Sequence, residues 1–309
     1  MVTSRTSSVK TDKEFQNIQK GTVNVPGGKV WYRMVGAQQK GTPLLVLHGG
    51  PGAPHDYLEP LEALANERPV IFYDQLGCGN SNRPSDRSLW TTARFVEEVD
   101  LVRAALKLDQ IHLLGQSWGA MLAVEYLLRK KPERIVSLIL SGPYLSTPRW
   151  IADQQKWIEQ LPEAIQQTIR KYEALEDYAS PEYQEAMIFF YKRHLCRVQP
   201  LPECMVRTFE KTGTDVYNYL WGYSEFTMTG TLKEVDLTER LPEIDLPVLF
   251  TCGEYDEATP AATALFQSKI AGSEMYIFRD ASHSHHLEKP EEYIRVVRDF
   301  LKRKEHKTE

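Results

Sequence analysis

The sequence predicts an α/β fold in which a mostly parallel central sheet is flanked by helices and interrupted by a helical insertion. Short apolar runs of strand length alternate with helical patterns in both terminal parts of the chain. This alternation is typical of parallel sheets covered on both faces. A middle segment is instead rich in Glu, Gln, Lys, Tyr and Trp and has few β-branched runs. Because 309 residues exceed the usual size of one core, we expect one domain with a large insertion, or two domains.

The elements of the predicted sheet lie in two zones that flank the insertion. The first zone holds apolar strand-like runs at residues 30–35, 44–47, 70–73, 111–114 and 135–140. Its helical patterns cover residues 92–108 and 118–130. The last zone repeats the alternation, with strands at 247–252 and 275–278 and helices at 260–270 and 290–302.

The middle zone reads as a set of helices. Pro148, Pro162 and Pro181 mark helix starts there, because proline is tolerated in the first helical turn. The chain therefore leaves the sheet, builds a cap and returns. We divide it into a loose N-terminal tail (1–20), a core (21–143 and 242–309) and a helical cap (144–241).

Composition excludes several classes of protein. The net charge of −5 gives no basic surface for nucleic acid, and no apolar run is long enough to span a membrane. The polar N-terminus lacks the apolar centre of a secretory signal, so we expect a cytoplasmic protein. We also expect a monomer or a small homo-oligomer. Reduced thiols are then expected at the four scattered cysteines, with a Cys196–Cys204 disulfide as the open alternative.

The stretch Gly115-Gln116-Ser117-Trp118-Gly119 predicts a reactive serine. It joins an apolar strand to a helix, and a sharp strand-to-helix turn holds its central residue in a strained conformation. The flanking glycines relieve the crowding and leave the serine hydroxyl exposed. The Trp118 N–H then lies at a helix N-terminus, where unsatisfied donors receive negative charge. An ordinary glycine-rich turn is the simpler alternative.

A serine nucleophile needs a base and a carboxylate that orients the base. Functional groups of open α/β sheets lie beyond the carboxyl ends of strands, which selects Asp256 and His283. The order Ser117, Asp256, His283 is that of α/β-hydrolases. Glu254 is a rival for the orienting acid and Asp280 a weaker one. The alternatives for His283 are a surface histidine and a metal cluster, but ligand spacing is lacking and we expect no metal.

The loop His48-Gly49-Gly50-Pro51-Gly52 follows a predicted strand and offers an oxyanion hole. Backbone N–H groups near Gly49 and Gly50, together with that of Trp118, would face the carbonyl oxygen of an acyl substrate. Each such donor contributes about 3 kcal/mol to the transition state. A flexible loop is one alternative. A phosphate loop is disfavoured because no Lys-Ser/Thr follows.

These motifs together resemble the proline iminopeptidase family of serine peptidases. The resemblance includes His48–Gly52, Gly115–Gly119 and the segments Asp74-Gln75-Leu76-Gly77-Cys78-Gly79-Asn80-Ser81, Trp221-Gly222-Tyr223-Ser224-Glu225-Phe226 and Gly253-Glu254-Tyr255-Asp256-Glu257-Ala258-Thr259-Pro260. It covers residues 21–302 and looks closest to the branch of the tricorn-interacting aminopeptidase. It implies an N-terminal exopeptidase with the triad Ser117, Asp256 and His283.

The resemblance also implies that Glu225 and Glu257 hold the α-ammonium of the substrate. Two carboxylates suit the two N–H donors of an N-terminal proline, and pinning the amine would leave only the first carbonyl within reach of Ser117. Solvated or ion-paired acids are the alternative for both residues. Five cap aromatics could wall an apolar substrate pocket, or could simply pack: Tyr217, Tyr219, Trp221, Tyr223 and Phe226.

We therefore expect a cofactor-free serine aminopeptidase that removes a first residue, preferably proline, from short peptides, amides or esters with a free N-terminus. An amidase or esterase for free amino-acid derivatives would use the same groups. A catalytically silent binding protein with this fold is the alternative from another class. Epoxide hydrolases and haloalkane dehalogenases are disfavoured because they need a carboxylate where this chain has Ser117.

Overall fold

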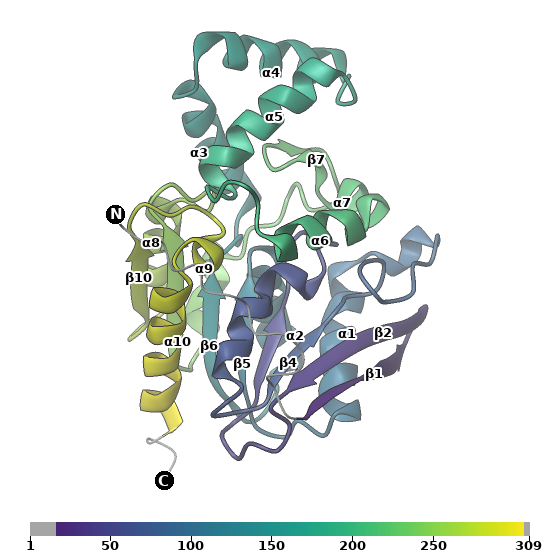
Figure 1. Ribbon diagram of the computed structural model, residues 1–309, viewed down its shortest axis with the longest axis vertical. Helices are drawn as coiled ribbons and strands as arrows, with labels where there is room; N and C mark the ends of the chain where they lie inside the picture. The colour runs from purple at the N-terminus through teal and green to yellow at the C-terminus, as the bar shows by residue number, and fades with distance from the viewer. Residues whose placement is uncertain (1–16, 306–309) are drawn as a thin grey trace, which may run out of the picture.

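The computed structural model describes residues 17–305, which form an eight-stranded sheet, helices on both of its faces and further helices above one end of its strands (Figure 1). The strand order is β1-β2-β4-β3-β5-β6-β9-β10. Strands β1, β2 and β4 pair antiparallel, and the other neighbours pair parallel. The bounds are β1 Ile18–Val25, β2 Gly28–Val35, β3 Leu44–Leu47, β4 Val70–Tyr73, β5 Ile111–Gln116, β6 Ile135–Ser141, β9 Val248–Gly253 and β10 Glu274–Phe278.

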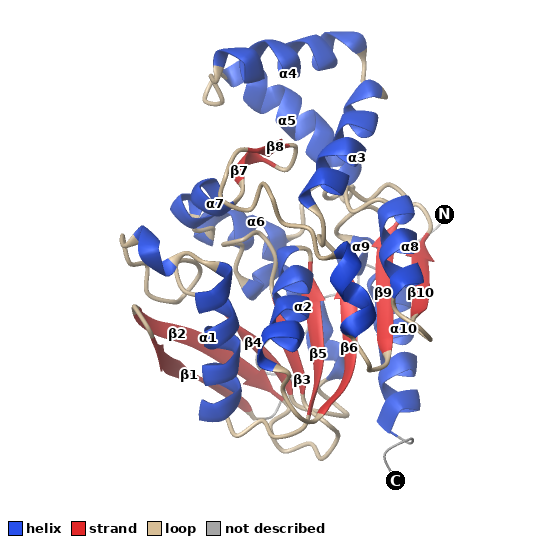
Figure 2. Ribbon diagram, turned by 180° about the vertical axis from the view of Figure 1, so that it is seen from behind, coloured by secondary structure: helices blue, strands red, loops and turns tan. Residues whose placement is uncertain are grey.

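Apolar residues on the two faces of the sheet form two separate cores. In β3, Leu45 and Leu47 belong to one core, while Leu44 and Val46 belong to the other, as the period of two in a strand requires. The first core is covered by α1 (Thr92–Ala105), α2 (Trp118–Lys130) and α8 (Pro260–Lys269). The second is covered by the 3-10 helix η1 (His55–Leu64) and α10 (Pro290–Glu305), with the short α9 (His285–Glu288) beside them (Figure 2).

The segment between β6 and β9 lies above the carboxyl ends of the parallel strands (Figures 1 and 2). Its bounds are α3 Thr147–Glu159, α4 Glu163–Leu175, α5 Pro181–His194, α6 Glu203–Lys211, α7 Thr214–Leu220, β7 Gly222–Ser224 and β8 Thr227–Met228. Pro148 and Pro181 lie in first helical turns, and Pro162 is the N-cap residue of α4. Helices α3, α4 and α5 share a third apolar cluster, the outer apolar cluster, which includes Ile169 and Phe190.

The structure differs from the sequence predictions in two elements. Strand β1 begins at Ile18, inside the predicted tail, and pairs with β2 along its whole length. It was missed because it is an edge strand of mainly polar residues, in which only Val23 and Val25 are buried. The remaining tail, residues 1–16, lies outside the described part. The second difference is the β7–β8 hairpin, which interrupts a zone expected to be helical.

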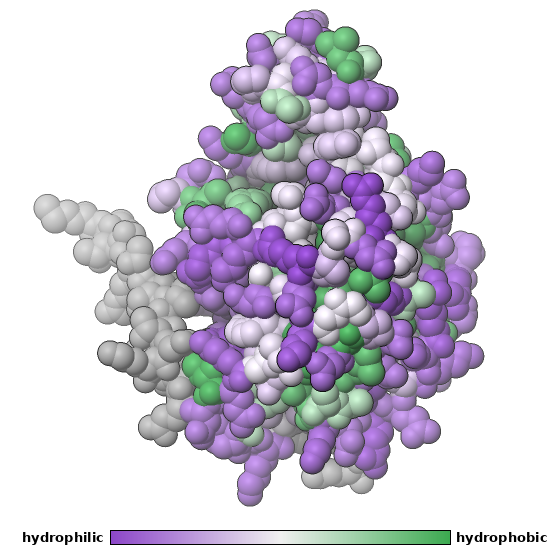
Figure 3. Space-filling view, turned by 90° about the vertical axis from the view of Figure 1, so that its right-hand side faces the viewer, coloured by the Kyte–Doolittle hydropathy of each residue, from purple (hydrophilic) through white to green (hydrophobic). Residues whose placement is uncertain are grey.

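The cysteines and the surface complete the description. All four cysteines are free and buried, so the expectation of reduced thiols holds and Cys196 is not bonded to Cys204. Among residues 17–305, no helix combines the length and apolarity needed to cross a bilayer. The face seen in Figure 3 is mostly hydrophilic, with hydrophobic side chains in small separate groups.

Candidate active site

Ser117 occupies a strained turn between β5 and α2. Its φ of 55° and ψ of −121° lie outside the regions that side chains favour. A Cβ on Gly115 would lie 2.2 Å from the carbonyl oxygen of Gly119, and one on Gly119 would lie 2.1 Å from that of Leu47. Only glycine fits at these two positions, so the spacing of the pentapeptide has a steric cause.

Asp256 and His283 are brought together from the ends of two neighbouring strands. Asp256 follows β9 and His283 follows β10, and His283 Nδ1 donates to Asp256 Oδ1 over 2.7 Å. The carboxylate also accepts the N–H of Ala258 at 2.7 Å and that of Gly253 at 3.1 Å. Asp256 is therefore fixed by three donors, and it holds the imidazole ring in one orientation.

Charge on these two residues is mutually stabilised. Burial opposes the charged form of His283, but the Asp256 carboxylate and its hydrogen bond outweigh burial and raise the histidine pKa. Burial likewise opposes ionisation of Asp256, but His283 and His285 outweigh it and lower the pKa of the acid. Asp256 is thus ionised at neutral pH and can stabilise an imidazolium.

The rival acids, Glu254 and Asp280, and the two other histidines, His285 and His286, form hydrogen bonds or ion pairs with other residues. Glu254 Oε2 accepts the N–H of Asp280 at 2.9 Å, and Asp280 pairs with Arg197 on the surface. His285 Nε2 lies 3.0 Å from Ser141 Oγ, and His286 Nε2 lies 3.1 Å from the carbonyl oxygen of Tyr57. Both histidines are buried, so the sequence around His283 is not a surface cluster.

Ser117 and His283 line one cavity of about 290 Å³ between the core and the cap segment. In the described chain no hydrogen bond joins the two side chains. Instead, the Gln116 side-chain nitrogen lies 3.0 Å from His283 Nε2. Ser117 and His283 thus line the same cavity, but the hydrogen-bond partner of His283 Nε2 is the Gln116 amide.

A chain of hydrogen bonds sets the direction of that contact. The Gly49 N–H, which can only donate, binds the Tyr57 hydroxyl at 2.8 Å. The hydroxyl proton then goes to Gln116 Oε1 at 2.5 Å, so the amide NH₂ faces His283. His283 Nε2 must accept, which is the tautomer a general base needs. Sequence reasoning missed Tyr57 and Gln116 because only the folded chain brings the η1 helix beside the turn.

The same contact changes the expected oxyanion donors. The Gly49 N–H is already bonded to Tyr57, whereas Gly50 lines the cavity beside Ser117. Trp118 is the first residue of α2, so its N–H has no acceptor within the helix. Of the three predicted donors, Gly50 and Trp118 are those that can serve an oxyanion in this arrangement.

Glu225 and Glu257 both line the cavity but come from different segments of the chain. Glu225 lies in the turn between β7 and β8, and its Oε1 accepts the Tyr217 hydroxyl at 2.8 Å, while its N–H donates to Tyr191 Oη at 3.2 Å. Glu257, 1% exposed, follows Asp256, and its Oε1 lies 3.5 Å from His283 Nε2. Neither carboxylate oxygen of Glu257 has a hydrogen-bond partner among the described residues.

A bound cation would stabilise the ionised forms of both carboxyl groups. Burial raises the pKa of Glu225 to about 6, partly offset by the Tyr217 hydrogen bond. Burial, and then the charges of Glu225 and Asp256, raise the pKa of Glu257 well above its usual value. An unpartnered buried carboxyl is costly, and a bound ammonium would relieve that cost.

The predicted pocket aromatics divide into two kinds. Tyr217 and Tyr223 line the cavity. Tyr219, Trp221 and Phe226 are absent from its described lining and pack elsewhere: Tyr219 against Trp90, Trp221 against Tyr144 and Phe226 in the outer apolar cluster. The cavity also has apolar and aromatic lining residues that sequence reasoning did not name: Ala53, Met187, Tyr191, Leu195, Met205 and Phe209.

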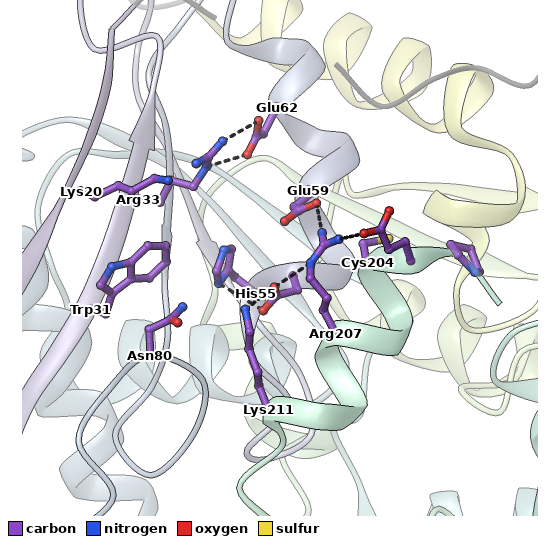
Figure 4. A pocket seen from close by; sticks show the side chains of 13 residues that line it. Lys20, Trp31, Arg33, His55, Glu59, Glu62, Asn80, Cys204, Arg207 and Lys211 are labelled. Carbon is purple, nitrogen blue, oxygen red and sulfur yellow. Dashed lines mark hydrogen bonds and ion pairs between the residues drawn. The ribbon is translucent and has the colours of Figure 1, made fainter. Parts of the chain in front are cut away.

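A second cavity, of about 480 Å³, lies between the β1–β2 edge, η1 and α6 (Figure 4). It contains His55, Asp56 and Glu59, whose donor atoms lie within 4.8 Å of one another. Arg207 and Lys211 already pair with the two carboxylates, so a metal ion would have to compete with these cations. None of the residues that carry the Ser117 site lines this cavity.

The chain is similar to known proteins over most of its length. The family described as "alpha/beta hydrolase fold" matches residues 42–290. A proline iminopeptidase of Heyndrickxia coagulans is 44% identical over 91% of this chain and 98% of its own. The structure of a proline iminopeptidase of Mycobacterium smegmatis superposes with a TM-score of 0.87 at 35% identity, covering 94% of this chain and all of its own.

A further solved structure, that of VinJ, superposes with a TM-score of 0.88 at 34% identity and covers 92% of this chain and 98% of its own. These likenesses extend over the core and the cap segment alike. The chain therefore belongs to the proline iminopeptidase family of the α/β hydrolase fold.

Proposed function

We propose that this protein is a serine aminopeptidase that releases the N-terminal residue, preferably proline, from short peptides, amides or esters with a free amine. This proposal depends most on two carboxyl groups, the buried Glu257 and the partly buried Glu225, which line the same cavity as Ser117 and His283. In this proposal residues 144–241 form the cap, and residues 21–143 and 242–309 form the core.

The first step is acylation of Ser117. The Ser117 hydroxyl displaces the Gln116 amide from His283 Nε2, and its oxygen attacks the first carbonyl of the substrate while Nε2 takes the proton. The Gly50 and Trp118 N–H groups stabilise the oxyanion. His283 then gives the proton to the leaving amine, and the bond between the first and second residues breaks.

The second step repeats the first with water. His283 takes a proton from the water, the resulting hydroxide attacks the acyl carbonyl, and Ser117 leaves with the proton. Free amino acid and a shortened peptide are the products. Every proton transfer uses His283, whose orientation depends on Asp256.

The carboxyl pair explains why only one residue is removed. A secondary ammonium, as in N-terminal proline, has two N–H donors, which suits two carboxylate acceptors in one cavity. Glu257 Oε1 lies 3.5 Å from His283 Nε2, so an amine held there places the first carbonyl, and no later one, beside Ser117. Charge-assisted hydrogen bonds in a buried site are strong enough to fix this register.

The test compares a free amine with a blocked one. We expect hydrolysis of prolyl-phenylalanine amide and no measurable hydrolysis of its N-acetyl derivative. Glu257→Gln should raise KM for the free substrate much more than Glu254→Gln, which alters a carboxylate bonded to Asp280 outside the cavity. Equal cleavage of the acetylated and free substrates would show that the amine is not recognised.

A further inference from the structure

The cavity has a buried inner end and an open rim. Ser117, Glu257 and His283 are 4%, 1% and 4% exposed. Phe209 and Tyr223, which line the same cavity, are 47% and 48% exposed. Large aromatic side chains are costly to leave in water, so two of them at one opening indicate a surface that is covered during function.

The direction of the substrate follows from these positions and rests on the proposed function. With its amine at Glu225 and Glu257, the substrate places its first carbonyl at Ser117. The rest of the substrate must then run outward, toward the rim. We propose that Phe209 and Tyr223 form a subsite for the leaving group, the residue that follows the released amino acid, and that this subsite takes an uncharged apolar or aromatic group.

Helix α6 presents the Phe209 side of this subsite on a fixed support. Met205, Thr208 and Phe209 line the cavity, and their spacing of three and four residues places them on one face of α6. The C-cap residue Thr212 also lines the cavity. Arg207 and Lys211 lie on another face, where both pair with Asp56 of η1 and Arg207 also pairs with Glu59 (Figure 4).

The Tyr223 part of the rim is also supported. The ring of Tyr223 stacks on that of Tyr178, with centroids 4.3 Å apart and an interplanar angle of 11°. The Tyr223 ring is thus held in place before substrate arrives. Binding a leaving group against it costs less conformational entropy than ordering a free side chain.

Charge in the cavity disfavours an acidic leaving group. Among the described lining residues, the ionisable acidic and basic side chains are those of Glu225, Glu257 and His283. The free carboxylate of a dipeptide would lie one residue beyond the scissile bond, in a partly buried space that already holds two carboxyl groups. The bound ammonium favours ionisation of both carboxyl groups but balances only one of the two negative charges, so a further carboxylate is repelled. Peptide amides, longer peptides and aryl amides avoid this repulsion.

The test measures kcat/KM for three substrates that share proline as the first residue: prolyl-phenylalanine amide, prolyl-glycine amide and prolyl-phenylalanine with a free carboxylate. We expect the phenylalanine amide to be preferred over the glycine amide by about tenfold. Phe209→Ala and Tyr223→Ala should each reduce this preference by about fivefold, the scale expected for a half-buried aromatic contact.

The matched control lies on the same helix. Val206 is 40% exposed, and it is not among the lining residues of the cavity, so Val206→Ala should leave the preference unchanged. Phe209→Lys supplies a counter-charge and should raise kcat/KM for the free acid relative to the amide by about tenfold, whereas Val206→Lys should not. Thermal unfolding of each variant checks that the fold is kept.

The outcomes separate this inference from the proposed function. If the wild type cleaves prolyl amides but the Phe209 and Tyr223 variants keep the wild-type preference, the subsite is refuted and the aminopeptidase remains. If folded Phe209→Lys leaves the ratio of free acid to amide unchanged, the charge argument is refuted. If the wild type cleaves none of the three substrates, the proposed function itself fails.

Discussion

Asp256→Asn is the sharpest test of the proposed catalytic groups, because the change keeps the shape of the side chain and removes its charge. Asp256 Oδ1 accepts from His283 Nδ1 and from the N–H of Ala258, both at 2.7 Å, and Oδ2 accepts the N–H of Gly253 at 3.1 Å. An asparagine has one accepting end only. In either orientation its NH₂ group meets a backbone N–H that needs an acceptor.

The size of the effect follows from the charge that is lost. Two unit charges about 4 Å apart attract by about 4 kcal/mol at an effective dielectric constant of about 20. Each 1.36 kcal/mol changes a rate by about tenfold, so losing this stabilisation of the imidazolium lowers kcat by about 10³-fold. An asparagine that turns its NH₂ toward His283 also forces the wrong tautomer, which brings the loss to about 10⁴-fold.

The assay is steady-state hydrolysis of prolyl-phenylalanine amide by the wild type, Asp256→Asn and Glu254→Gln. The control should stay within about twofold of the wild type, because glutamine keeps an acceptor for the N–H of Asp280. Asp256→Asn should lose kcat with little change in KM, since Asp256 does not touch the amine. If Asp256→Asn stays within tenfold of the wild type while Glu254→Gln loses activity, the orienting acid is misassigned.

Three further predictions concern the nucleophile, the amine site and the turn. A fluorophosphonate reagent should label the wild type and not Ser117→Ala, as mass spectrometry of the labelled peptide would show; labelling of the variant would place the nucleophile elsewhere. Burial raises the pKa of Glu225 to about 6, and the protonated form cannot pair with an ammonium, so KM should rise as the pH falls through 6. In Glu225→Gln, KM should be high throughout, and a wild-type KM that is constant from pH 5 to 8 would contradict the pairing. Gly119→Ala should lower the free energy of unfolding by about 3 kcal/mol in a denaturant titration, because its Cβ would lie 2.1 Å from the Leu47 carbonyl oxygen. Gly272→Ala, with nothing within 4 Å of the new Cβ, should cost only about 1 kcal/mol, and equal costs would remove the steric argument.

The elements that were predicted correctly are those whose local sequence has one physical solution. Short near-continuous apolar runs such as residues 44–47 and 70–73 favour strands buried on both faces over helices, because they are too short for a helix, and both are such strands. Gly115 and Gly119 leave no room for a side chain, so the tight turn at Ser117 was predictable from their spacing. Strand β1 was missed because most of its stability comes from pairing with β2, which a polar edge sequence does not reveal.

The sequence by itself determined the fold class and a short list of candidate chemical groups, because strand and helix periods, turn glycines and strand ends are local properties. Only the tertiary structure decided how these groups are arranged. In the folded chain, the Gly49 N–H donates to Tyr57 and the Gln116 amide contacts His283. Trp221 and Phe226 lie outside the described lining of the cavity. The fold also places Phe209 of α6 at the rim of the Ser117 cavity. Gln116 and His283 are 167 positions apart, and the position of Phe209 depends on how the segment between β6 and β9 packs on the sheet, which no local pattern encodes.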